Sequence, residues 1–110
     1  MRLARVIYKG QMAGLLTQQD DGSFIFRYTH EWISDPAKPA ISLTLPKTEN
    51  PYQSEFLFPF FFHMLPEGTN RLLVTRDLRI DPDDDFGLLL HTARTDTIGA
   101  VTIEKVEPIA

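Results

Sequence analysis

Two acidic patterns and three histidines are the residues of this sequence whose types and spacing could do chemistry. The first pattern is the triplet Asp85-Phe86-Gly87, whose aspartate binds Mg²⁺ in enzymes that transfer phosphoryl groups from ATP. That chemistry also requires a glycine-rich phosphate loop, a strand lysine and an upstream catalytic aspartate, and the sequence contains none of these motifs. We therefore predict that the triplet begins a helix, with Phe86 pointing into the core.

The second pattern is a run of aspartates at positions 81, 83 and 85, which has the spacing that opens a calcium-binding loop. Such a loop also requires glycine at its sixth position and an acidic residue at its twelfth. Phe86 and Thr92 occupy these two positions. The aspartates are therefore predicted to serve the N-terminus of a helix, where the helix dipole favours negative charge.

The three histidines are His30, His63 and His91, and no two of them are three or four residues apart, as zinc ligands on one helix would be. They are predicted to lie at the surface or at its boundary with the core. The sequence also lacks a Gly-x-Ser-x-Gly motif and a glycine-rich phosphate cradle. It therefore predicts no catalytic residue, no cofactor and no metal ion.

The composition, with 43% hydrophobic and 24% charged residues, is typical of one small globular domain spanning residues 1–110. The net charge of −4 and the scattered Lys and Arg residues argue against direct binding of nucleic acid and fit a protein partner with a basic surface better. The longest apolar run, Phe56 to Met64, is far shorter than the roughly 20 residues of a membrane helix. No signal peptide and no cysteine occur, so we expect a cytoplasmic chain without membrane association.

Alternating apolar residues and turn signals predict a sheet that opens with a hairpin around Lys9-Gly10-Gln11. In Phe24 to Tyr28, for example, the three aromatic residues share one face. The segment from 47 to 53 is predicted to be a polar loop. The predicted strands are Leu3 to Tyr8, Met12 to Thr17, Phe24 to Tyr28, Ile41 to Leu45 and Gly99 to Val106.

Three helices are predicted to cover this sheet, which gives an α+β fold: a small antiparallel sheet, partly barrel-like, with a cluster of about three short helices. Their predicted ranges are Leu57 to Met64 with Pro59 in the first turn, Asn70 to Leu78 with its leucines on the buried side, and Pro82 to Thr92 with Asp81 as the N-cap. The aromatic block of 56 to 62 and Trp32 are predicted to belong to the core or its rim.

Four segments of the chain resemble, in the right order, the N-terminal subdomain of HipA-type serine/threonine kinases. They are Phe26 to Ile33, Ile41 to Pro46, Phe58 to Gly68, and Asp84 to Leu90 with its continuation from Asp96 to Val101. The resemblance covers nearly the whole chain. In that family the catalytic core follows the Gly-Ala-Val strand, whereas only a few residues follow Val101 here, so we expect a freestanding copy of a regulatory piece.

The resemblance implies an antitoxin of a split toxin–antitoxin module, in which a short HipS-like protein binds and inhibits a separately encoded HipA-like kinase. A helix-turn-helix DNA-binding repressor usually completes such a complex, so the chain would reach DNA only through its partners. Two alternatives stay open. The chain could be a complementing subunit that activates or stabilises a split kinase, or a small-ligand or peptide-binding module unrelated to kinases.

The candidate contact with the kinase is the polar turn between the first and second predicted helices, because surface turns concentrate recognition residues. In the resembling family this segment lies on the side that can face the kinase core. Many HipA-type sequences have glycine at the position of Arg94, so this arginine is a second candidate. The predicted partner-binding residues are Glu67, Gly68, Thr69, Asn70, Arg71 and Arg94.

Overall fold

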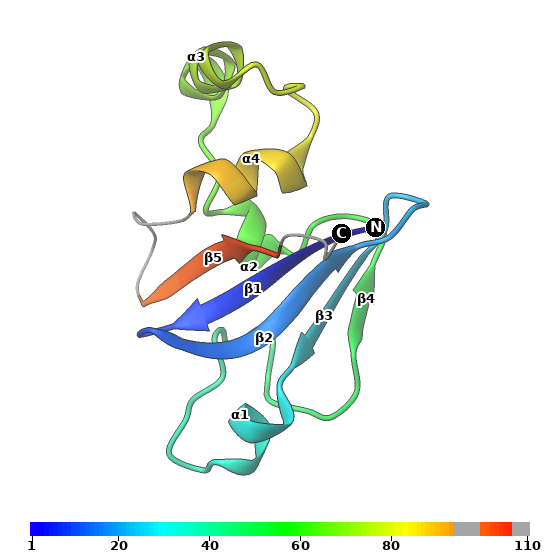
Figure 1. Cartoon of the computed structure of the whole chain (residues 1–110), viewed down its shortest axis with the longest axis vertical. Helices are drawn as coiled ribbons and strands as arrows, with labels where there is room; N and C mark the ends of the chain where they lie inside the picture. Colours follow the sequence, from blue (N-terminus) through cyan, green and yellow to red (C-terminus); the bar gives the residue numbers. More distant parts are fainter. Residues whose placement is uncertain (94–99, 107–110) are drawn as a thin grey trace.

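The computed structural model describes residues 1–93 and 100–106 of the chain. Within them, five strands form one antiparallel sheet and four helices lie around it (Figure 1). The strands are β1 (Arg2–Tyr8), β2 (Gln11–Gln18), β3 (Phe24–Tyr28), β4 (Tyr52–Ser54) and β5 (Val101–Lys105). The helices are α1 (His30–Ser34), α2 (Pro59–Phe62), α3 (Gly68–Leu78) and α4 (Asp85–Thr92). The predicted α+β class is confirmed, with four helices where about three were expected.

The sheet has the strand order β4-β3-β2-β1-β5, and each neighbouring pair is antiparallel. The last strand of the chain, β5, returns to pair with the first, so the two ends of the described chain lie close together (Figure 1). β4 and β5 form opposite edges of the sheet. The sheet is therefore open. A partly barrel-like sheet was expected, and the strands do not close into a barrel.

The hairpin between β1 and β2 turns over two residues, Lys9 and Gly10, as predicted. Both have positive φ angles, 48° and 82°. Two-residue hairpin turns with positive φ at both positions match the right-handed twist of the strands, and glycine adopts this conformation at little cost.

The hydrophobic core joins one face of the sheet to α2 and α4. Phe26 of β3 lies 5.7 Å, between ring centroids, from Phe61 of α2. Phe24 lies 6.3 Å from Phe86 of α4. The alternation of aromatic residues along β3 thus places them against the helices, as the period of a strand requires.

Helix α2 begins with Pro59 at its first position, where the missing N–H of proline costs no helical hydrogen bond. The aromatic block of 56 to 62 is divided between core and surface. Phe58 and Phe61 are buried, which confirms the prediction for them, whereas Phe56 and Phe62 are exposed.

The strand predicted from Ile41 to Leu45 is wrong. Ile41 and Leu45 are buried, but the segment forms a tight turn in which Leu45 N–H donates to the Ser42 carbonyl at 3.1 Å. The buried hydroxyl of Tyr28 fixes this turn, because it donates to the Leu45 carbonyl and accepts a hydrogen bond from Ile41 N–H. The edge strand comes instead from β4, which lies partly in the predicted polar loop.

One helix was not predicted from the sequence, and another begins at a different N-cap residue from the predicted one. The short α1 was not predicted; Thr29 caps it, and its buried Trp32 donates a hydrogen bond to the Pro39 carbonyl. Helix α4 begins at Asp85 with Asp84 as its N-cap, so the start predicted at Pro82 with Asp81 as the cap is wrong. None of the helices in the described ranges is long and apolar enough to cross a membrane.

Candidate functional site

The predicted contact turn forms the start of α3. Glu67 is the N-cap residue, and its side chain makes no capping hydrogen bond. Gly68 has a φ angle of 57°, and Glu67, Gly68, Thr69 and Asn70 are all exposed. The turn is thus a surface feature, as predicted. Arg94, the other candidate, lies outside the described residues.

Arg71 differs from the rest of the turn because its side chain is only 18% exposed and is bound within the chain. Its guanidinium donates to the Pro82 carbonyl, from Nε at 3.0 Å and from Nη2 at 2.6 Å. The same Nη2 pairs with Asp85 at 2.6 Å. Arg71 therefore ties α3 to the first turn of α4, and its role in a contact would be to position the turn.

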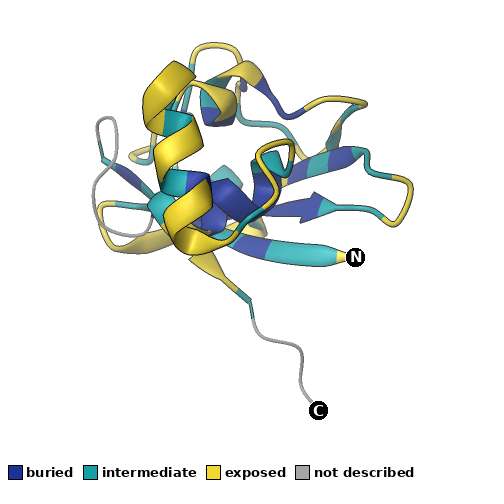
Figure 2. Cartoon of the chain, turned by 90° about the horizontal axis from the view of Figure 1, so that it is seen from above, coloured by how far each residue is buried: buried dark blue, intermediate teal, exposed yellow. Residues whose placement is uncertain are grey.

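Helix α3 carries an exposed apolar surface that the sequence analysis did not predict. Leu72, Leu73 and Leu78 are 60%, 45% and 43% exposed, so the prediction that they lie on the buried side is wrong. Thr75 is the one buried residue of this helix. Figure 2, which views the chain from the side on which α3 lies, shows exposed residues along most of the helix. The helix stands away from the sheet, with α4 between them (Figure 1).

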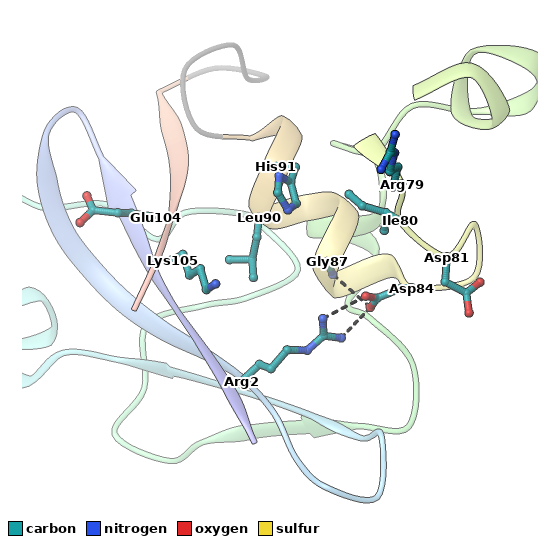
Figure 3. A pocket seen from close by; sticks show the side chains of 10 residues that line it. All are labelled: Arg2, Arg79, Ile80, Asp81, Asp84, Gly87, Leu90, His91, Glu104 and Lys105. Atoms are coloured by element: carbon teal, nitrogen blue, oxygen red, sulfur yellow. Dashed lines mark hydrogen bonds and ion pairs between the residues drawn. The ribbon is translucent and has the colours of Figure 1, made fainter. Parts of the chain in front are cut away.

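The C-terminal end of α3 borders a pocket of about 550 Å³ (Figure 3). Arg79 and Ile80 line it from the end of α3, Leu90 and His91 from α4, and Glu104 and Lys105 from the end of β5. Arg79 has a left-handed conformation with φ of 56°. Ile80 N–H donates to the Thr75 carbonyl at 2.8 Å and Arg79 N–H to the Arg76 carbonyl at 3.2 Å, the pattern of a helix-ending Schellman motif.

At the floor of this pocket, Arg2 of β1 holds the start of α4. Its guanidinium binds both carboxylate oxygens of Asp84, at 3.0 and 2.5 Å, and also contacts Gln18. Asp84 in turn accepts a hydrogen bond from Gly87 N–H at 3.1 Å. A Cβ atom at position 87 would lie 2.3 Å from the Asp84 carboxylate. Glycine is therefore required for this close approach.

The hydrogen bonds from the Arg2 side chain lower the pKa of Asp84, with further lowering from Gly87 N–H and from the charges of Arg2 and His91. Burial acts in the opposite direction but does not prevail. A carboxyl group whose folded-state pKa is lowered stabilises the fold in its ionised form.

We expect the contribution of Asp84 to stability to be complete above the ordinary aspartate pKa of about 3.9. Because the folded-state pKa is lowered, this contribution is lost as the pH falls through that lower value. Chemical denaturation of wild type and Asp84→Asn from neutral to acidic pH should show a difference in unfolding free energy that shrinks in this acidic range. The exposed exchange Asp77→Asn serves as the control. A difference that stays constant through the acidic range would contradict the assignment.

The acidic patterns singled out in the sequence serve the packing of α4. Asp85 pairs with Arg71, and Phe86 is fully buried beneath the Arg2 guanidinium, which lies 5.0 Å from its ring centroid. The prediction of a helix start with Phe86 in the core is confirmed. The three histidines are exposed. Across residues 1–93 and 100–106, no three His, Cys, Asp or Glu side chains are grouped so that they could hold a metal ion.

Fold and sequence together define the class of this protein. The family profile of the HipA N-terminal domain matches residues 4–104, and the chain belongs to this family. A solved structure described as the N-terminal domain of HipA toxin superposes with a TM-score of 0.72 at 30% identity, covering 97% of this chain and 94% of that one.

Relatives of two sizes are similar to the chain. The putative kinase Y4mE of Sinorhizobium fredii is 33% identical over 111 residues, which cover 99% of this chain and 26% of the relative. An uncharacterized protein of Haemophilus influenzae is 32% identical over 105 residues, which cover 96% of this chain and 93% of that protein. The chain thus spans about a quarter of the putative kinase and nearly all of the Haemophilus protein.

Proposed function

We propose that the chain is a non-catalytic regulator that binds a cognate HipA-like serine/threonine kinase and neutralises it, as an antitoxin. The observation that carries the proposal is the size of the relatives. The same domain accounts for about a quarter of a putative kinase and for nearly all of a short Haemophilus protein. A domain that occurs in both contexts is suited to act on a kinase from a separate chain.

The surface of the chain is consistent with a binding role. Asp85, the aspartate of the kinase-like triplet, pairs with Arg71, and its neighbour Asp84 pairs with Arg2, so both carboxylates hold the start of α4 in place. The turn residues Glu67 to Asn70 are exposed and remain candidates for the contact, together with Arg94. Arg71 would position the turn through its contacts with the Pro82 carbonyl and Asp85.

Two further elements complete the proposal. A helix-turn-helix DNA-binding repressor would join through the complex, because the net charge of −4 disfavours direct contact of this chain with nucleic acid. The complex would act in the cytoplasm, where the kinase finds ATP.

One observation favours a second candidate function, a complementing subunit. In the putative kinase Y4mE the domain belongs to the same chain as the remaining three quarters, so binding of a separate domain to a shortened kinase would restore that complete arrangement. The two candidates require the same interface and differ in whether the bound kinase is inactive or active.

Co-expression with a HipA-like kinase, sought first among the genes that neighbour this one, separates the two candidates. We expect the two chains to co-purify, the growth arrest caused by the kinase to be relieved, and its autophosphorylation to fall. Kinase expressed alone and a catalytically inactive kinase are the controls. Co-purification with persistent or deeper arrest would replace the antitoxin role by the complementing role, and failure to co-purify would contradict both.

A further inference from the structure

Helix α3 is poorly stabilised by its own packing. Eleven residues form it, and Thr75 is the only one that is buried. Isolated helices of this length are marginal in water, and most helices gain their stability from an apolar face packed on a core. Arg71 and the Schellman motif at Arg79 hold its two ends, but its leucines remain exposed. The helix therefore presents apolar surface that the described chain does not cover.

Three residues share the exposed side of this helix, and Arg79 follows its end. Positions 72 and 76 are spaced i and i+4, which places them on one face, and position 73 adjoins them. A spacing of this kind is used by helices that bind in a groove of their partner. We refer to Leu72, Leu73, Arg76 and Arg79 as the α3 stripe.

The charge of the stripe is opposite to that of the whole chain, which is −4. Asp77 lies 3.9 Å from Arg76, and both side chains are 75% exposed, so this ion pair is long and solvated. Arginines near a helix C-terminus also suit the helix dipole, but the dipole gives no reason for two exposed leucines beside them. The stripe combines apolar and cationic groups, which fits an apolar groove bordered by carboxylates.

The position of α3 indicates which protein supplies this groove. Arg79 and Ile80 border the same pocket as Glu104 and Lys105, at the end of β5 (Figure 3). The family is described as the N-terminal domain of HipA, so the rest of the putative kinase Y4mE, about three quarters of its length, is expected to follow this strand. The part of such a kinase that follows the domain would thus begin near the pocket that the C-terminal end of α3 borders.

We propose that the α3 stripe docks in an apolar groove bordered by carboxylates on the HipA-like kinase. The inference rests on the proposed function and names the surface and the chemistry of its contact. It also changes the expectation from net charge alone, since the kinase would offer acidic rather than basic groups at this contact. Leu72 and Leu73 would supply buried apolar anchors, and Arg76 would accelerate association by electrostatic attraction.

Binding kinetics with the purified, catalytically inactive kinase test the two components separately. The apolar variant is the double exchange Leu72→Ala with Leu73→Ala, and the charge variant is Arg76→Glu. Leu43→Ala is the matched apolar control, because Leu43 is 99% exposed on the turn of 42 to 45. Arg27→Glu is the matched charge control, because Arg27 is exposed on β3. Thermal melting and circular dichroism verify that each variant remains folded.

We expect the apolar variant to weaken binding by about tenfold or more, as for truncated anchors. Arg76→Glu should lower the association rate constant by about fivefold or more, and this difference should shrink between about 50 and 300 mM salt as charges are screened. Both controls should bind within about twofold of wild type.

The outcomes distinguish this inference from the proposed function. If wild type binds the kinase and the stripe variants bind equally well, the function stands and the docking inference is overturned. It is also overturned if either control weakens binding as much as its matched stripe variant. If wild type does not bind the kinase at all, the proposed function fails and the inference fails with it.

Discussion

Phe61→Ala is expected to lower the free energy of unfolding by about 3–5 kcal/mol, the range for removal of a buried aromatic ring. Phe61 is fully buried, and its ring centroid lies 5.7 Å from that of Phe26 and 5.2 Å from that of Phe60. The exchange removes the side chain that joins α2 to the sheet and leaves a cavity that the surrounding rings cannot fill. For a domain whose total stability is about 5–15 kcal/mol, this is a large fraction.

The adjacent residue supplies the control. Phe62 belongs to the same helix but is 41% exposed, so Phe62→Ala should cost less than about 1 kcal/mol. Urea denaturation followed by tryptophan fluorescence measures both, since Trp32 is buried in the native state. Equal losses for the two variants would contradict the division of the aromatic block into a buried and an exposed side.

Much of the sheet could be predicted because its signals are local. The alternation of Phe24, Phe26 and Tyr28 fixes which face of β3 is buried, and Gly10 permits the hairpin turn. The same alternation of apolar and polar residues led to the wrong prediction of a strand from Ile41 to Leu45. There the ends are buried, but the chain turns because the Tyr28 hydroxyl, far away in the sequence, satisfies backbone groups at both ends.

The start of α4 is a second feature that the local sequence alone does not determine. Five consecutive residues from 81 to 85 contain four aspartates, each a good N-cap by type. Asp84 becomes the cap in the structure, where Arg2 binds its carboxylate across 82 positions of sequence and Gly87 leaves room for the contact. Helix type and approximate position follow from local preference, whereas the choice among equivalent caps depends on tertiary contacts.

The surface position of the candidate contact turn could be predicted from the sequence, whereas the exposure of the α3 leucines could not. The polar composition of Glu67 to Asn70 indicated a surface turn, which the structure has. The exposure of the α3 leucines was not predicted, because leucines in a helix usually face the core. Arg76 lies one turn after Leu72 and Leu73 on the same side of the predicted helix, and a charge at this position was a signal that this side is exposed.

Arg71→Ala is expected to lower the free energy of unfolding by about 1–3 kcal/mol, the cost of removing the hydrogen-bond partner of partly buried polar groups. The exchange leaves the Asp85 carboxylate and the Pro82 carbonyl without the donors that they have at 2.6 Å. Since the Asp85 side chain is 29% exposed, water can replace part of what is lost, which keeps the cost below that of a fully buried ion pair.

The loss should be largest locally, because Arg71 is the residue that links the first turn of α3 to the start of α4. Amide hydrogen exchange should therefore accelerate along α3 more than in β2 or β3. Arg76→Ala on the same helix is the control, and its 75% exposed side chain should contribute less than about 0.5 kcal/mol. If the kinase binds α3 as we propose, Arg71→Ala also weakens the complex, since the helix must then be ordered upon binding. Unchanged exchange along α3, with unchanged stability, would show that the arginine does not anchor this helix.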